Sequence, residues 1–168
     1  GETVAGSPYT ISATLSPPGV LGNYNITYNT ANFTINQKAA SVTPNNNSKI
    51  YGDADPVPLT TGTLNGFLPA DGVTDTYSRV AGETVAGSPY TISATLSRPG
   101  VLGNYNINYN TANFTINQKT ASVTPNNNSK TYGDADPVPL TTGTLSGFLV
   151  ADGVTATYSR VAGETVAG

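Results

Sequence analysis

The sequence predicts an all-β protein built of tandem repeats, each folding as an antiparallel, immunoglobulin-like β-sandwich. The hexapeptide Gly-Glu-Thr-Val-Ala-Gly begins at Gly1, Gly82 and Gly163, so the chain repeats with a period of 81 residues. Short runs of alternating apolar and polar residues fill the repeat, and 18 glycines and 12 prolines punctuate the chain. Many short strands separated by turn residues are typical of a sandwich. A β-grasp-like sheet is the alternative architecture.

The copies of the repeat are nearly identical. Of the 87 pairs of residues that lie 81 positions apart, seven differ, namely Pro17/Arg98, Thr27/Asn108, Ala39/Thr120, Ile50/Thr131, Asn65/Ser146, Pro69/Val150 and Asp75/Ala156. A feature of one repeat is therefore expected in its neighbours, and no single repeat is expected to carry a specialised site.

We take residues 38–118 as one repeat. Its front is expected to begin with two short strands. These strands, at 40–43 and 48–51, flank a Pro-Asn-Asn-Asn cluster of turn residues. An Asp-Ala-Asp-Pro loop follows, because aspartate and proline both favour turns. Residues 57–64 are expected to form an edge strand, since Pro58 has no N–H to donate to a central ladder.

The back of the repeat carries the clearest strand pattern. One helical turn is expected at 67–72, and strands are expected at 74–80, 89–96, 104–109 and 112–117. In three of these strands the apolar residues occupy alternate positions: Tyr90, Ile92, Ala94 and Leu96; Tyr105, Ile107 and Tyr109; Phe114 and Ile116. A period of two with one apolar face predicts strands that pack on a core on one side.

The boundary between two repeats is marked by a change of parity. Phe114 and Ile116 lie at even positions, whereas Ala121 and Val123 lie at odd positions. One continuous strand cannot place both sets on the same face, so a break is expected near residues 117–120. About four residues are too few for a flexible linker, and we expect successive repeats to be joined stiffly, end to end.

This frame divides the chain into the back of one repeat (1–37), a whole repeat (38–118) and the front of another (119–168). Each partial repeat is expected to be completed by a neighbour, so the expected partner is the repeat itself, continued head to tail. The continuation could be covalent, in a longer filament, or could come from strand complementation between chains. A circularly permuted unit is a third possibility.

Composition excludes several classes of function. The chain has no cysteine and no histidine, which removes disulfides, thiolate nucleophiles and the commonest general base and metal ligand. The formal net charge is −3, so there is no basic surface to neutralise nucleic acid. No apolar run approaches the length that spans a bilayer, so an export signal or membrane anchor is expected outside this segment.

Four motifs carry a family resemblance. They are Ser-Lys-Thr-Tyr-Gly-Asp-Ala-Asp-Pro at 129–137 (and 48–56 with Ile50), Thr-Leu-Ser-Gly-Phe at 144–148, Ala-Gly-Glu-Thr-Val-Ala-Gly-Ser-Pro-Tyr-Thr-Ile at 81–92, and Asn-Tyr-Asn-Ile…Asn-Phe-Thr-Ile at 23–35. In this order they resemble the MBG-type repeat with a Tyr-Gly-x motif. The resemblance covers the whole repeat. It implies an all-β, exported domain found in tandem in large bacterial surface proteins and adhesins, with no catalytic residues.

Three aspartates are candidates for a calcium site near a joint between repeats. Asp53, Asp55 and Asp71 could supply carboxylate oxygens, which Ca²⁺ prefers. The glycine and glutamate spacing of a strong calcium loop is missing, so a turn held by aspartate side chains is the favoured interpretation. No other cofactor is expected.

Two kinds of covalent chemistry have only weak support in the sequence. Asp71, Asp75 and Glu83 could be paired carboxylates for glycoside hydrolysis, but the copy of Asp75 is Ala156. Lys49 and an asparagine could form an intramolecular isopeptide bond with Glu83 as the nearby acid, although an exposed lysine on a strand is the commoner situation. The chain is therefore predicted not to be an enzyme.

Tyrosines could form a sugar-binding platform or fill the core. Tyr24, Tyr28, Tyr51, Tyr77 and their copies are expected mainly in the core, each with its hydroxyl at the edge. Together these features favour a structural stalk or filament segment on the bacterial surface. The alternative is an adhesin module whose repeats bind a host glycan or protein directly.

Overall fold

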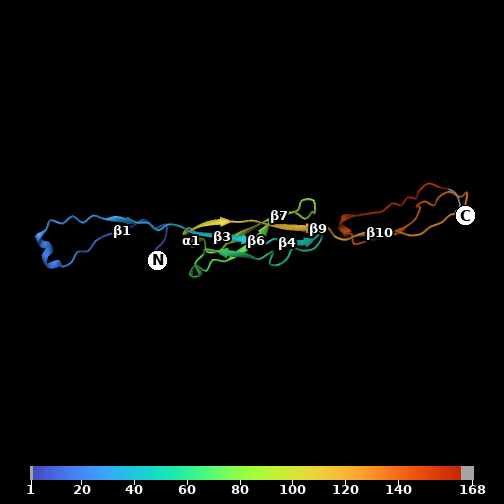
Figure 1. The fold of residues 1–168 in the computed structure, drawn as a ribbon. Coiled ribbons are helices and arrows are strands. Elements are labelled where there is room, and N and C mark those ends of the chain that lie inside the picture. The colour runs from blue at the N-terminus through green and yellow to red at the C-terminus, as the bar shows by residue number, and fades with distance from the viewer. Residues whose placement is uncertain (1, 164–168) are drawn as a thin grey trace.

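The computed structural model describes residues 2–163 and shows an elongated molecule whose three parts follow one another along one axis (Figure 1). The N-terminal part contains β1 (Tyr9–Ile11), η1 (Pro18–Asn23) and β2 (Ala31–Phe33). The central part contains β3 (Lys38–Pro44), β4 (Asn47–Ile50), β5 (Gly62–Asn65), η2 (Pro69–Asp71), β6 (Asp75–Arg79), β7 (Tyr90–Leu96), α1 (Pro99–Leu102), β8 (Tyr105–Tyr109) and β9 (Ala112–Asn117). The C-terminal part contains β10 (Ser122–Pro125), β11 (Gly143–Ser146) and η3 (Val150–Asp152).

The central part is a two-sheet sandwich. One sheet has the strand order β5-β3-β8, and the other has the order β4-β9-β7-β6. The predicted all-β, sandwich-like class is therefore confirmed. None of the helical segments among residues 2–163 is long and apolar enough to span a bilayer.

The strand directions differ from the antiparallel arrangement that was expected. β3 pairs with β8 in parallel, and β4 pairs with β9 in parallel, while β3–β5, β6–β7 and β7–β9 are antiparallel. Alternation of apolar residues encodes which face of a strand is buried but not the direction of its neighbour. The sequence pattern therefore could not reveal the two parallel pairings.

The two parallel pairings form one continuous seam between the first and the last segments of the repeat. Lys38 is the partner of Tyr105, and Asn47 is the partner of Phe114, so the same offset holds in both sheets. At the crossover between the sheets, the Asn110 side chain donates a hydrogen bond to Thr43 Oγ1 at 2.7 Å. The crossover thus keeps the two segments hydrogen-bonded, and we call residues 38–50 and 105–117 the parallel seam.

The core lies between the two sheets, as the alternation predicts. The fully buried side chains are Val42, Ile92, Phe114 and Ile116, and Tyr90, Leu96 and Tyr105 are buried beside them. All of these except Val42, which lies on β3, are apolar positions expected to share a face in 89–96, 104–109 and 112–117. Ala94 is half-buried, and Tyr109 is exposed because it lies at the end of the edge strand β8.

Several element boundaries moved. Only the end of the expected strand 57–64 is extended, as β5, and it lies at the edge of its sheet, as Pro58 predicts. The helical turn at 67–72 is present as η2, and the short helix α1 was not anticipated. The break near residues 117–120 is confirmed, since β9 ends at Asn117 and β10 begins at Ser122.

The two outer parts repeat the local pairings of the central sandwich without its core. β1 pairs with β2 in the register of β7 with β9, and β10 pairs with β11 in the register of β3 with β5. Phe33 is 53% exposed, whereas its copy Phe114 is fully buried. The difference arises because each outer part has one two-stranded sheet, whereas seven strands in two sheets enclose the core of the central part.

Candidate functional site

The aspartate-rich loop after β4 is the centre of a cluster of four charged side chains. Lys49 lies on β4, Asp55 in the loop, Arg79 at the end of β6 and Glu83 in the segment that follows. The Arg79 guanidinium donates two hydrogen bonds to Asp55, Nε to Oδ2 at 2.7 Å and Nη2 to Oδ1 at 2.9 Å. Lys49 Nζ lies 2.8 Å from Asp55 Oδ1, and both cations also pair with Glu83. We call these four residues the ion cluster.

The cations of the ion cluster are held against the apolar core. The side chains of Lys49 and Arg79 are 6% and 7% exposed, whereas that of Glu83 is 62% exposed. The Arg79 guanidinium carbon lies 4.8 Å from the centroid of the Phe114 ring and 5.5 Å from that of Tyr90, a cation–π arrangement. Lys49 was expected on an exposed face; that expectation is wrong, because Asp55 and Glu83 neutralise its ammonium group and permit its burial.

The electrostatics of the ion cluster keep every member charged. The hydrogen bonds from Arg79, assisted by Lys49, lower the pKa of the Asp55 carboxyl to about 2. Asp55 in turn raises the pKa of Arg79 and, together with Glu83, that of Lys49. The bonds from Lys49 and then Arg79 lower the pKa of Glu83. The side-chain partners of Lys49 Nζ are the carboxylates of Asp55 and Glu83, not an asparagine amide.

Stability is therefore expected to fall in acid. Because the pKa of Asp55 is about 2 in the folded protein and near its ordinary 3.8 when unfolded, its stabilisation is complete above about pH 4 and is lost as the pH falls through 2. Glu83 acts in the same direction. We expect the melting temperature, followed by circular dichroism, to be constant from pH 7 to 5 and to drop between pH 4 and 2. Asp55→Asn should flatten this drop, and an equally steep drop in the variant would contradict the assignment.

The three candidate calcium ligands lie in different surroundings. Asp53 is exposed, the Asp55 carboxylate pairs with Arg79 and Lys49, and the Asp71 carboxylate accepts a hydrogen bond from the Tyr105 hydroxyl. Within residues 2–163, no group of three or more acidic residues gathers at metal-binding distance. Calcium binding at these three aspartates stays a prediction.

The three candidate hydrolytic carboxylates are each tied to other side chains. Asp71 accepts a hydrogen bond from Tyr105, Asp75 accepts one from Tyr77, and Glu83 pairs with both cations of the ion cluster. Burial, then the Asp75 bond, raises the pKa of Tyr77 to about 12. Each of the three carboxylates therefore has its own side-chain partners, different from those of the other two.

The arginine of the ion cluster was not anticipated from the sequence. The third part of the chain repeats the same bonds: Arg160 Nε and Nη2 donate to Asp136 at 2.8 and 2.9 Å, and Lys130 Nζ lies 2.8 Å from Asp136. The Tyr-Gly-Asp-Ala-Asp-Pro motif thus carries the aspartate that anchors its loop to an arginine 24 residues further along the chain.

A family model of the MBG domain of the YGX type matches residues 40–115 and again residues 121–168. The chain belongs to this family. No curated protein and no solved structure gave a significant match. The Tyr-Gly dipeptide at Tyr51 and Gly52 lies beside the ion cluster, so the family's characteristic motif coincides with the charged site.

Tyr51 also makes the contact between the central MBG repeat and the part that follows it. Its hydroxyl donates a hydrogen bond to Asp152 Oδ1 at 2.9 Å, and this bond raises the pKa of Tyr51. Gly52, at φ +87°, packs against Leu149: a Cβ on Gly52 would lie 2.7 Å from Leu149 Cδ1. The Tyr-Gly dipeptide therefore lies between the ion cluster and the joint, and it makes the contacts at the joint.

The joint on the N-terminal side of the central MBG repeat uses other residues. The Val4 N–H donates to Asn104 Oδ1 at 3.0 Å, and Gln37 Nε2 donates to the Gly103 carbonyl at 3.1 Å. The Lys38 N–H donates to the Asn104 carbonyl at 3.0 Å. No local pattern in the sequence predicts these contacts, because their partners lie far apart in the chain.

Of the four tyrosine positions that could form a sugar-binding platform, three pack inward in the central MBG repeat. Tyr51 and Tyr77 are half-buried against the core cluster, and Tyr105, the copy of Tyr24, is 4% exposed. Tyr109, the copy of Tyr28, is 49% exposed. The complete repeat therefore presents one of these four tyrosines at its surface.

Proposed function

We propose that the chain is a load-bearing segment of a stalk or filament in a large extracellular bacterial surface protein. MBG domains are repeat domains of large surface proteins and form a structural, non-catalytic family. The observation that carries the proposal is the parallel seam, which joins the first and the last segments of one repeat.

The seam is oriented to resist a pull along the molecule. The repeat begins with β3 and ends with β9. Figure 1 shows the N-terminal part continuing from one end of the central part and the C-terminal part from the other. A pull between these ends slides residues 38–50 along residues 105–117, which loads the hydrogen bonds of both sheets together. Because many bonds must break at once, the barrier to forced unfolding is high, and that barrier sets the unfolding rate under force.

We expect a single strong unfolding event when the 168-residue chain is pulled by its ends in a single-molecule force experiment. The chain should lengthen by at most about 290 Å, from about 3.3–3.6 Å for each of the 81 residues in the repeat. Asn110→Ala removes the side-chain bond across the seam and should lower the unfolding force. Asn29→Ala, the same change in the N-terminal part, should leave the force unchanged.

The direction of pulling provides the decisive control. Thr76 and Thr95 are exposed partners in the antiparallel pair β6–β7, so handles attached there open that pair bond by bond. This pull should need much less force than the pull along the axis. Equal forces in the two directions would contradict a stalk that is reinforced by the seam.

The adhesin alternative has less support from the structure. A carbohydrate platform needs several exposed aromatic rings, and in the repeat of residues 38–118 the exposed aromatic residue is Tyr109, on the edge strand β8. The proposal therefore assigns adhesion, where it occurs, to other parts of the surface protein.

A further inference from the structure

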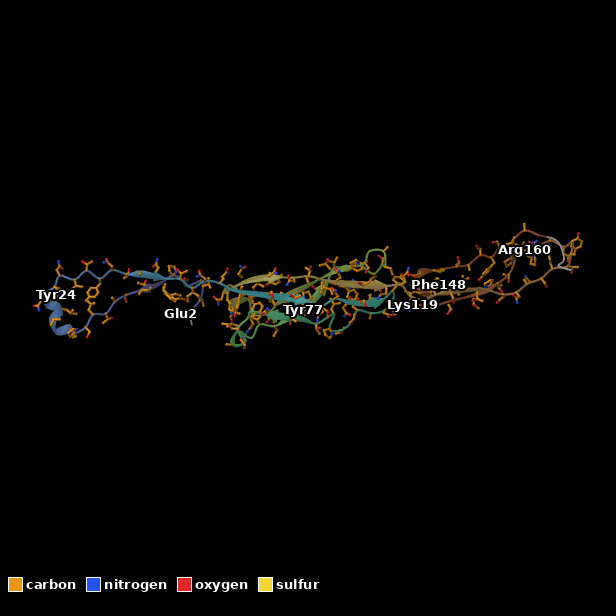
Figure 2. The ribbon with its side chains drawn as sticks, in the orientation of Figure 1. Glu2, Tyr24, Tyr77, Lys119, Phe148 and Arg160 are labelled. Atoms are coloured by element: carbon orange, nitrogen blue, oxygen red, sulfur yellow. The ribbon has the colours of Figure 1, made fainter. Side chains whose placement is uncertain are left out.

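A groove lies at the joint between the central repeat and the C-terminal part. It lies where Lys119 and Phe148 meet, and Tyr24 is at the far end of the molecule (Figure 2). On the side of the central repeat the groove is lined by Tyr51, Val85 and Gln118, and on the other side by Phe148, Leu149 and Asp152.

Residues of each wall have copies 81 positions earlier in the chain. The structure shows what those copies bind. Val4 and Gln37, the copies of Val85 and Gln118, donate hydrogen bonds to Asn104 Oδ1 and to the Gly103 carbonyl. This wall therefore presents the amide groups that bind a Gly-Asn pair.

The contacts of the central repeat indicate in the same way what the opposite wall binds. The ring centroid of Phe67 lies 4.9 Å from that of Tyr105, the Leu68 N–H donates to the Tyr105 hydroxyl at 3.0 Å, and that hydroxyl donates to Asp71. Phe67, Leu68 and Asp71 are the copies of Phe148, Leu149 and Asp152. The two walls of the groove thus independently identify the same tripeptide, Gly-Asn-Tyr.

We propose that this groove binds the Gly-Asn-Tyr segment of a further copy of the repeat. The proposal rests on the proposed stalk and names the partner that closes each of its joints. In a solution of this chain the segment comes from Gly22-Asn23-Tyr24 of a second molecule, because Gly103-Asn104-Tyr105 is already engaged within the central repeat. Tyr24 is 68% exposed, whereas its copy Tyr105 is 4% exposed.

The Asp152 carboxylate in the groove can accept hydrogen bonds from two tyrosines at once. Asp152 accepts the Tyr51 hydrogen bond on Oδ1, whereas Asp71 accepts that of Tyr105 on Oδ2. A carboxylate has acceptor sites on both oxygens, so the two bonds are compatible. A complete joint therefore has one aspartate held between a tyrosine of the preceding repeat and a tyrosine of its own repeat.

Docking of the segment also unites two exposed apolar surfaces. Ile11 and Phe33 are 48% and 53% exposed in the N-terminal part, and Val123 is 52% exposed in the C-terminal part. Their copies Ile92, Phe114 and Val42 are fully buried in the central sandwich. The second molecule therefore brings the apolar half that the C-terminal part needs, and its burial drives association.

The test is sedimentation velocity of the 168-residue chain from about 1 μM to 1 mM. We expect head-to-tail association that grows with concentration. Tyr24→Ala should weaken it by at least about 30-fold, as loss of a buried aromatic anchor does at an interface. Tyr28→Ala is the matched control and should have no effect, because its copy Tyr109 stays exposed in the complete repeat. A monomer at every concentration, or equal effects of the two variants, would overturn the proposal.

A residue-level measurement locates the contact. Hydrogen exchange at the Val85 amide should slow as the concentration rises, while the Val4 amide, already bonded to Asn104, should be protected throughout. An unchanged Val85 amide in an associated sample would overturn the assigned groove. The unfolding force of the single central repeat does not depend on this association, so failure here leaves the stalk proposal to be judged on its own.

Discussion

Phe114→Ala is expected to destabilise the central sandwich by about 3–5 kcal/mol, the usual effect of emptying a buried phenylalanine site. The Phe114 side chain is fully buried and belongs to the core cluster with Tyr90, Ile92 and Ile116. Its ring also faces the Arg79 guanidinium at 4.8 Å, so the substitution removes support from the ion cluster as well. Urea unfolding followed by near-ultraviolet circular dichroism of the tyrosines measures the effect.

The chain contains its own control for this substitution. Phe33 is the copy of Phe114, with identical neighbours from Ala31 to Gln37, but it is 53% exposed. Phe33→Ala should change the free energy of unfolding of the sandwich by less than about 0.5 kcal/mol, as surface substitutions do. Similar losses from the two variants would show that the core is not confined to residues 38–118.

Asp55→Ala is expected to cost about 2–3 kcal/mol, somewhat less than the about 3–5 kcal/mol for breaking a fully buried ion pair. The loss is large because Lys49 and Arg79 stay buried after their shared carboxylate is removed. It is moderated because Asp55 is 35% exposed and Glu83 still contacts both cations. The same urea titration at pH 7 reports it.

Asp136→Ala is the matched control for the ion cluster. Asp136 pairs with Lys130 and Arg160 in the same geometry, but these side chains are 22% and 33% exposed, and Asp136 is 37% exposed. Exposed pairs contribute about 0–1 kcal/mol, so little change is expected. A loss from Asp136→Ala as large as that from Asp55→Ala would mean that burial of the cations is not the cause.

The strands of the repeat could be predicted where local residues decide them. Alternation placed Tyr90, Ile92 and Phe114 on the buried face, and the parity change before Ala121 located the break between repeats. The parallel seam could not be predicted, because strand direction depends on partners 67 residues away, such as Lys38 and Tyr105. The Arg79–Asp55 pair was missed for a similar reason, since 24 residues separate its members.

The sequence by itself determined the local pairings. Neither outer part has a complete sandwich, yet β1–β2 and β10–β11 adopt the registers of their copies. Tyr9 pairs with Phe33 as Tyr90 pairs with Phe114. Val123 pairs with Leu145 as Val42 pairs with Leu64. Only the tertiary structure decided burial. The same phenylalanine is 53% exposed at position 33 and fully buried at position 114, because a two-stranded pair covers an apolar side chain on one side and a second sheet must cover the other.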